Sequence, residues 1–133
     1  MRTLLLVLTA SFWGVICCGQ TVFEFINSGV AKNDLGNYIG AISDFNKAIE
    51  INPNYAEAYY NRGVAKDYLG DYKGVFVDFN KTIEINTKYA EAYYNRGVAK
   101  YNLKDKDGAC FDWRKAGDLG IKEAYEMIKK YCI

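Results

Sequence analysis

A twelve-residue segment occurs twice in this chain without a change, and it constrains the fold more than any other feature. The segment YAEAYYNRGVAK runs over residues 55–66 and again over residues 89–100, a displacement of 34 residues. A further 34 residues toward the N-terminus, Gly29, Ala31 and Lys32 stand in register with it. An internal period of this length indicates one supersecondary unit that stacks on its own copies.

Each unit has the pattern of two helices joined by a tight turn. In the second unit the residues Tyr59, Gly63, Lys66 and Leu69 fall close to helical spacing, and a second helical pattern begins a few residues later. Gly70 and Asp71 stand between the two patterns. Glycine permits the left-handed backbone that ends a helix, and the Asp side chain can cap the next helix. The sequence therefore predicts a row of helical hairpins.

The large and small residues of each unit resemble the pattern of the tetratricopeptide repeat (TPR) family over residues 22–121. The resemblance rests on Phe25, Gly29, Ala41, Phe45, Ala48 and Pro53 in the first unit, on Tyr59, Gly63, Val75, Phe79, Thr82 and Thr87 in the second, and on Tyr93, Gly97, Ala109, Trp113 and Ala116 in the third. Val75, Thr82 and Thr87 depart from the family pattern, so we expect looser packing in the second unit. The resemblance implies an all-α fold, an α-solenoid of three TPR helix-turn-helix units wound into a right-handed superhelix. The units are residues 22–55, 56–89 and 90–121.

The last stretch of the chain, residues 121–132, has a different pattern. Its apolar stripe consists of Ile121, Ala124, Tyr125, Ile128 and Cys132. An open stack of repeats leaves its last apolar face uncovered, and an amphipathic helix can cover that face. We therefore predict a C-terminal capping helix over residues 121–132.

Residues 1–19 have the pattern of a signal peptide. Arg2 supplies one positive charge, residues 4–18 are uncharged and mostly apolar, and Gly19 is small. The apolar part is shorter than the roughly 20 residues of a membrane-spanning helix. We expect cleavage after Gly19, a mature TPR domain over residues 20–133, and export to the periplasm or out of the cell. The alternatives are a lipid anchor on Cys18 and an uncleaved signal anchor, and either would hold the protein at a membrane.

Two cysteines, Cys110 and Cys132, remain after that cleavage. Export implies an oxidising compartment, in which the two thiols could form a disulfide. An antiparallel helix pair that turns around Leu119 and Gly120 would bring them to a similar height. Two buried free thiols fit the sequence equally well. Titration of free thiols in the denatured exported protein distinguishes the two states.

The sequence contains no recognisable enzymatic constellation. It has no His, and therefore no Ser–His or Cys–His nucleophile pair and no zinc site of the His type. It also has no glycine-rich phosphate-binding loop. We expect no catalytic, cofactor-binding or metal-binding residues. Removal of residues 1–19 takes Arg2 away, so 17 Lys and Arg become 16 against 16 Asp and Glu, and nucleic acid is not an expected partner.

The TPR resemblance implies that the first helix of each unit lines a concave groove. Carried over onto this sequence, the groove residues are Ile26, Asn27, Val30, Tyr60, Asn61, Val64, Tyr68, Tyr94, Asn95, Val98 and Tyr101. Aromatic rings give contact area at low entropic cost, and Asn can bond a peptide backbone as donor and as acceptor. We therefore expect a monomeric interaction module that binds an extended peptide or a partner protein. The alternative is a structural protein of an envelope complex that uses its convex face or its ends.

One well-known ligand of the family is not expected here. TPR domains that bind acidic chaperone tails hold the carboxylates with Lys, Asn and Arg. The corresponding positions hold Ile26, Val30, Asn61, Glu91 and Asn95. Only the Asn residues match, and Glu91 has the wrong charge for a carboxylate ligand. The partner should not be an acidic chaperone tail.

Arg62 and Arg96 recur with the repeat, as do Asp44, Asp78 and Asp112. We expect the arginines to join successive units by pairing Arg62 with Asp44 and Arg96 with Asp78. The alternatives are pairing within a unit, Arg62 with Asp78 and Arg96 with Asp112, or exposed side chains of little energetic weight.

Overall fold

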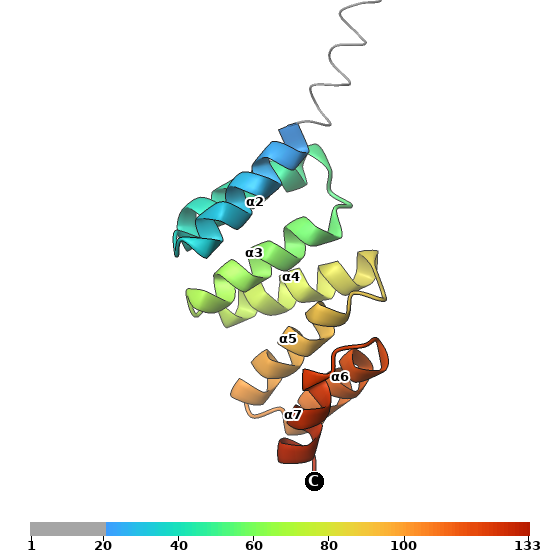
Figure 1. Cartoon of the computed structure of the whole chain (residues 1–133). Coiled ribbons are helices and arrows are strands. Elements are labelled where there is room, and N and C mark those ends of the chain that lie inside the picture. The colour runs from blue at the N-terminus through green and yellow to red at the C-terminus, as the bar shows by residue number, and fades with distance from the viewer. Residues whose placement is uncertain (1–20) are drawn as a thin grey trace, which may run out of the picture.

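The computed structural model describes residues 21–133, and this part of the chain is helical without a strand (Figure 1). The first helix covers residues 21–34 of the described part. The others are α2 (Tyr38–Ile51), α3 (Ala56–Tyr68), α4 (Tyr72–Ile85), α5 (Ala90–Asn102), α6 (Lys106–Asp118) and α7 (Glu123–Tyr131). The predicted all-α fold of three helix pairs and one further helix is confirmed. The predicted signal peptide, with Cys18, lies outside the described residues.

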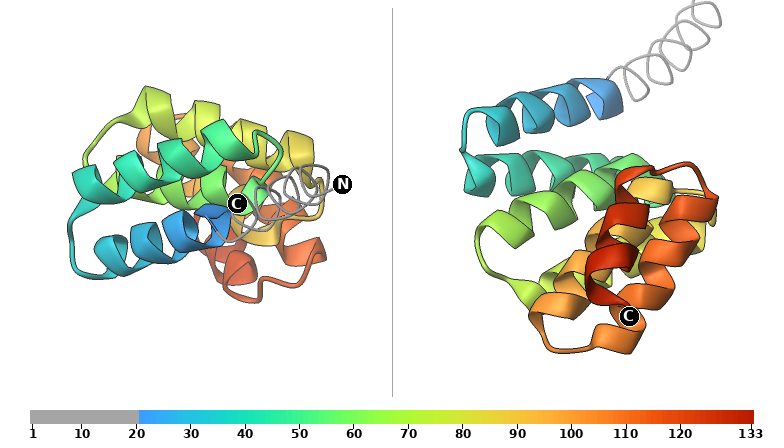
Figure 2. Two further views of the ribbon diagram at one scale, coloured as in Figure 1. Left: turned by 90° about the horizontal axis from the view of Figure 1, so that it is seen from above. Right: turned by 60° about the horizontal axis from the view of Figure 1, so that its bottom comes forward.

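The helices follow one another as a stack in which each contacts its neighbours in the sequence (Figure 2). The order of contacts runs from α2 and α3 through α4 and α5 to α6 and α7. Such an open stack is an α-solenoid, whose core is divided among successive interfaces. Within residues 21–133, no helix has both the length and the apolar character needed to cross a membrane.

Each unit is held together by a large ring that packs on a glycine. The pairs are Gly29 with Phe45, Gly63 with Phe79, and Gly97 with Trp113. The three rings are buried almost completely. A Cβ atom on Gly63 would lie 2.8 Å from Phe79 Cε1, closer than real side chains approach one another. Glycine at this position therefore sets how closely the two helices of a unit can pack.

Two of the three residues that depart from the family pattern in the second unit lie in the core. Val75 and Thr82 are both fully buried. The Thr82 hydroxyl donates a hydrogen bond of 2.8 Å to the backbone oxygen of Asp78, one turn earlier in the same helix. A buried hydroxyl that is satisfied in this way costs little. Thr87 is exposed in the turn after the second helix of the unit, and looser packing of this unit stays a prediction.

Buried aspartates join the two helices within a unit. Asp78 is fully buried and accepts hydrogen bonds from Arg62 Nε at 2.9 Å and Arg62 Nη2 at 2.6 Å, and Lys66 Nζ lies 2.9 Å away. Arg96, Lys100 and Asp112 repeat this arrangement in the next unit. A bidentate pair of this kind is the strongest geometry available to an ion pair, and it leaves the carboxylate well satisfied.

The expected pairing between units, Arg62 with Asp44 and Arg96 with Asp78, is therefore wrong. The antiparallel hairpin places each arginine opposite the aspartate sixteen residues later in its own unit. Asp44 is occupied by Lys32 Nζ at 2.8 Å and by the Ser28 hydroxyl at 2.6 Å. Burial raises the pKa of Asp44, but these hydrogen bonds outweigh it and leave the pKa below its usual value.

The arginines still link successive units, through a different partner. Arg62 Nη1 donates to Asn46 Oδ1 at 2.8 Å, and Arg96 Nη1 donates to Asn80 Oδ1 at 2.9 Å. Asn46 and Asn80 belong to the second helix of the preceding unit. Each guanidinium thus contacts the aspartate of its own unit and the amide of the unit before it.

The last helix covers the end of the stack, as expected, although α7 is shorter than the predicted range of 121–132. Ala124 is fully buried, whereas Tyr125, predicted on the same apolar stripe, is more than half exposed. Cys110 and Cys132 form a disulfide between α6 and the end of α7, with Cα atoms 5.7 Å apart. A link across 22 residues contributes about 3 kcal/mol by restricting the unfolded chain.

The turn before α6 contains a strained residue. Gly36 and Gly70 end their helices with φ of 78° and 75°, and Lys104 takes the equivalent position with φ of 70°. A side chain in this left-handed region costs free energy that glycine does not. We predict that Lys104→Gly raises the free energy of unfolding by about 1 kcal/mol, measured by urea denaturation. Lys104→Ala keeps the Cβ atom, so it should raise the free energy of unfolding only a little. If Lys104→Gly does not raise the free energy of unfolding, Lys104 is not strained.

A double-mutant cycle tests the pairing within units. We expect Arg62→Met and Asp78→Asn to couple by about 2 kcal/mol in urea unfolding, because each change removes the same buried contact. The matched cycle of Arg62→Met with Asp44→Asn should show coupling below about 0.5 kcal/mol, the usual error for independent sites. A larger coupling energy for Arg62 with Asp44 than for Arg62 with Asp78 would support the pairing between units.

Candidate functional site

Two cavities lie along the helices that open each unit. The first has a volume of about 400 Å³, and the second has about 230 Å³. Val30, Asn33, Asp34, Tyr38, Tyr60, Asn61, Val64 and Tyr68 line the first cavity. Tyr60, Glu91, Tyr94, Asn95, Ile121 and Glu123 line the second. Because Tyr60 belongs to both, the two cavities adjoin at this side chain, and we call their combined lining the inner groove.

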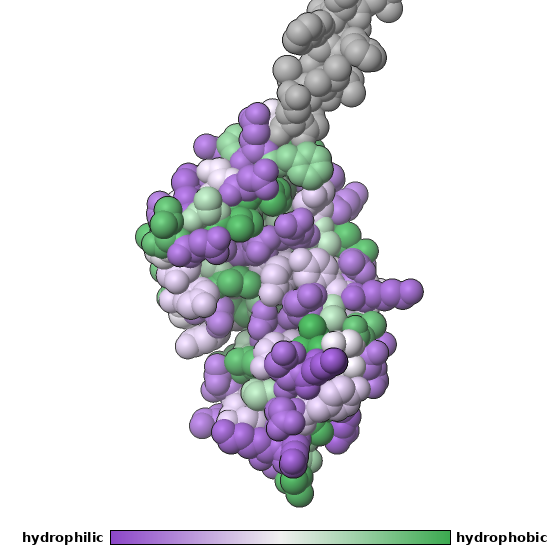
Figure 3. Space-filling model, viewed as in Figure 1, coloured by the Kyte–Doolittle hydropathy of each residue, from purple (hydrophilic) through white to green (hydrophobic). Residues whose placement is uncertain are grey.

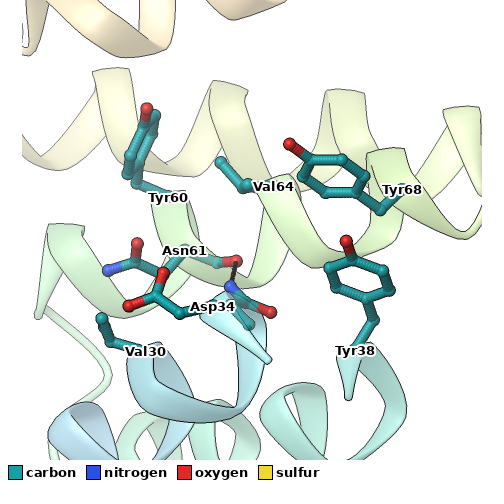
Figure 4. Close-up of a pocket in the computed structure, with 8 residues that line it drawn as sticks. Val30, Asp34, Tyr38, Tyr60, Asn61, Val64 and Tyr68 are labelled. Carbon is teal, nitrogen blue, oxygen red and sulfur yellow. Dashed lines mark hydrogen bonds between the residues drawn. The ribbon is translucent and has the colours of Figure 1, made fainter. Parts of the chain in front are cut away.

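Figure 4 shows how the first cavity is built. Tyr60, Val64 and Tyr68 follow one another along α3, as the four-residue spacing of a helix requires. Asp34 lies across from them, at the end of the first helix. Tyr38, at the start of α2, stacks on Tyr68 with ring centroids 4.7 Å apart and planes within 2°. The cavity is therefore aromatic at one end and carries a carboxylate.

Asparagine side chains connect the helices that form the inner groove. Asn33 Nδ2 donates to the backbone oxygen of Asn61 at 3.2 Å, which is the dashed line in Figure 4. Asn95 Nδ2 donates to the Tyr60 hydroxyl at 2.9 Å. The Oδ1 atom of Asn33 is buried and has no hydrogen-bond partner within the protein. This oxygen is therefore an unpaired acceptor inside the wall of the groove.

The charged residues of the inner groove all carry the same sign. They are Asp34, Glu91 and Glu123. Burial and then the negative charge of Glu91 raise the pKa of Tyr60, although the hydrogen bond from Asn95 lowers it. Burial, neighbouring Tyr60 and nearby carboxylates also raise the pKa of Tyr89, whose ring centroid lies 5.0 Å from that of Tyr60. Burial is the main cause of both shifts, and the neighbouring carboxylates add to it.

Several of the predicted groove residues are brought together in the structure. Val30, Tyr60, Asn61, Val64 and Tyr68 meet at the first cavity, and Tyr60, Tyr94 and Asn95 meet at the second. Each of these positions was identified by its register in the repeat.

The other predicted groove residues lie elsewhere. Ile26 is only 3% exposed and belongs to the core, so it cannot contact a ligand. Asn27 is exposed but lines neither cavity, and Val98 packs against the core. The Tyr101 ring lies 4.5 Å from that of Tyr131 and 5.8 Å from that of Trp113, so it packs beneath α7.

Some of the lining residues could not be predicted from the repeat pattern. Tyr38 begins a second helix, and second helices are not expected to face the groove. Ile121 and Glu123 belong to the capping segment, which folds back far enough to close one side of the second cavity. Among residues 21–133 there is no cluster of potential ligands that could hold a metal ion.

Comparison with known proteins agrees with this architecture. A family model described as TPR repeat matches residues 29–66, which include the first glycine–ring pair and the shared tyrosine of the inner groove. Residues 29–66 are thus identified as a TPR repeat, and the fold of the described residues is that of a TPR solenoid. TPR solenoids are modules for protein–protein interaction, and this role in general terms follows for the chain.

Solved TPR structures superimpose on most of the chain. The Arabidopsis OM64 TPR domain is 26% identical with a TM-score of 0.81, over 84% of this chain and 94% of that one. The crystal structure of MamA is 26% identical with a TM-score of 0.75, over 78% of this chain and 62% of that one. The first TPR of Spaghetti (RPAP3), bound to the HSP90 peptide SRMEEVD, is 24% identical with a TM-score of 0.80. This match covers 85% of this chain and 91% of that one. No curated protein matches the sequence.

The raised pKa of Tyr60 gives a test of the charge in the groove. A negative Glu91 opposes ionisation of the phenol, so Glu91→Gln should lower the pKa of Tyr60 while leaving it above its ordinary value through burial. A pH titration by NMR of protein labelled at the tyrosine Cζ atoms measures this. Glu126→Gln, an exposed change on α7, is the control. If Glu126→Gln changed the pKa of Tyr60 as much as Glu91→Gln does, Glu91 would not be the charge that raises it.

Proposed function

We propose that this protein is an exported adaptor whose inner groove holds an extended segment of a partner protein. The observation that carries the proposal is that Tyr60 lines two cavities, which places them next to each other across successive units. An extended peptide needs adjoining sites of this kind, because its side chains and backbone groups are spread along its length. We propose no catalytic role.

The chemistry of the lining supports a peptide ligand. Tyr38, Tyr60, Tyr68 and Tyr94 offer rigid rings with polar tips, which give contact area at a low cost in side-chain entropy. Their hydroxyl groups can donate hydrogen bonds to a ligand and accept them from it. A groove of this kind can recognise backbone and side-chain groups together.

An acidic chaperone tail is not the proposed ligand. The Spaghetti (RPAP3) domain is bound to a peptide, SRMEEVD, that carries three acidic side chains. The inner groove of the present chain is lined by Asp34, Glu91 and Glu123 and by no Lys or Arg. Negative side chains facing a negative ligand would weaken binding.

Two observations support export. The first nineteen residues have the pattern of a cleaved signal peptide, as set out above. The disulfide between Cys110 and Cys132 belongs to the kind of bond that persists in oxidising compartments. We therefore propose a periplasmic or secreted protein that begins at Gln20.

A second candidate function is assembly through the outer face. Val77 of α4 and Phe111 of α6 occupy equivalent positions of the repeat, are each 65% exposed, and line neither cavity. Exposed apolar side chains at a repeated position could join the protein to an envelope complex. Figure 3 shows one face of the molecule, on which polar side chains prevail and apolar ones are scattered among them.

Photocrosslinking in the producing cell distinguishes the two functions. A benzophenone amino acid placed at Tyr68, in the inner groove, is compared with one at Phe111, because both positions hold exposed aromatic rings. The groove proposal predicts a cross-linked partner at Tyr68 and a much weaker product at Phe111, measured by mass spectrometry. A product at Phe111 alone would favour assembly through the outer face and contradict the groove proposal.

A further inference from the structure

We propose that the segment held in the inner groove is cationic, and that a Lys or Arg side chain of the partner enters the first cavity beside Asp34. This inference rests on the proposed function, and it names the chemical class of the partner. It follows from the sign of the charges that line the inner groove and from the aromatic end of the first cavity.

The charge of the groove follows from the buried ion pairs. In α3 and α5, Arg62 and Lys66 are bound to Asp78, and Arg96 and Lys100 are bound to Asp112. These cations point toward the second helix of their unit, and none of them lines either cavity.

A lysine of the first helix is likewise bound to an aspartate of the second helix of its unit, because Lys32 Nζ lies 2.8 Å from Asp44. The acids on the same helices, Asp34 and Glu91, instead line the cavities, and α7 adds Glu123. The inner groove therefore carries three carboxylates with no basic side chain to neutralise them. A complementary partner brings positive charge.

Asp34 gives the first cavity a carboxylate with two acceptor oxygens. Lys and Arg side chains carry donors and no acceptors, so they can bond to this carboxylate, whereas Asp and Glu would repel it. The hydroxyl groups of Tyr38, Tyr60 and Tyr68 can accept a hydrogen bond from such a donor as well.

The remaining lining suits a long basic side chain. Val30 and Val64 provide an apolar wall for the methylene groups of Lys or Arg. Tyr38 and Tyr68 place aromatic rings at the same cavity, and a cation near a tyrosine ring is attracted to its face. The volume of about 400 Å³ leaves room for such a side chain together with part of the backbone that carries it.

The experiment uses the mature chain, residues 20–133 with its disulfide intact, and a phage-displayed library of random twelve-residue peptides. We expect the selected peptides to be enriched in Lys and Arg by about threefold or more over the unselected library, as charge complementarity requires. The strongest selected peptide is then synthesised, and its Kd is measured by fluorescence anisotropy at low and high salt. Binding should weaken as salt rises, because the charges lie at a partly exposed surface.

Two sets of variants with equal net charge separate the position of the acids from their number. The groove variant is Asp34→Asn, Glu91→Gln, Glu123→Gln, and the control is Asp118→Asn, Glu50→Gln, Glu126→Gln. The control acids are exposed and line neither cavity, and Glu126 shares the first turn of α7 with Glu123. We expect the Kd of the basic peptide to rise about tenfold or more in the groove variant, and less than about threefold in the control. Circular dichroism verifies that each variant is folded.

The outcomes separate this inference from the proposed function. Peptides without enrichment in basic residues, whose binding is lost in Tyr68→Ala but kept in the groove variant, would overturn the cationic partner and leave the groove function standing. Equal weakening by the groove and control variants would also overturn it, because binding would then depend on net charge alone. If selected peptides bind Tyr68→Ala as well as the parent chain, and cross-linking at Tyr68 gives no partner, the groove function itself is contradicted.

Discussion

The contact on which this molecule depends is the buried aspartate that receives an arginine and a lysine from the facing helix. Asp78 and Asp112 are fully buried, and an unpaired carboxylate at that depth would be strongly destabilising. Each is satisfied by two N–H groups of one arginine and by one lysine. The two helices of a unit must therefore meet in one register. The glycine that faces the buried ring sets the distance at which they do so.

The same contact determines the charge on the opposite side of the helix. The arginine and the lysine of α3, and those of α5, are directed toward the buried aspartate of their unit. These side chains are therefore not available on the side of the helix that faces the groove. The side that remains for the groove carries tyrosines, asparagines and acids. Stability and binding chemistry are thus related through one set of side chains. Repetition of the unit extends the contact between Arg, Lys and Asp along the stack, whereas the groove acids Asp34 and Glu123 occupy positions at which no other unit has an acid.

The period of 34 residues made most of the fold predictable. It identifies the unit, the glycine and the ring that pack together, and those lining residues that occupy equivalent positions, such as Tyr60 and Tyr94. The same period could not decide the partner of Arg62. Asp44 and Asp78 are equivalent in sequence, and only the way in which the antiparallel helices face each other distinguishes them.

The remaining differences arise where the repeat is interrupted. Tyr101 has the register of a groove residue, but α7 covers it, because the end of the stack needs a cap that the repeat does not contain. Ile26 has a groove register too, yet it is buried in the core that the first helix shares with α2 and α3. Tyr38 reaches the first cavity only because its ring stacks on Tyr68 at the turn between helices. These placements depend on the ends and turns of the stack, and the periodic positions carry no information about them.

The central claim is that the helices hold their cations on one side and present a negative groove on the other. The electrostatic potential at individual backbone amides measures this directly. It is obtained by NMR from the difference in paramagnetic relaxation caused by a cationic and by an anionic nitroxide in solution. The account predicts a clearly negative potential at the amides of Asp34, Asn61 and Asn95, and a less negative one at Val77 and Phe111 on the outer face. A neutral or positive potential at the three groove amides would contradict it.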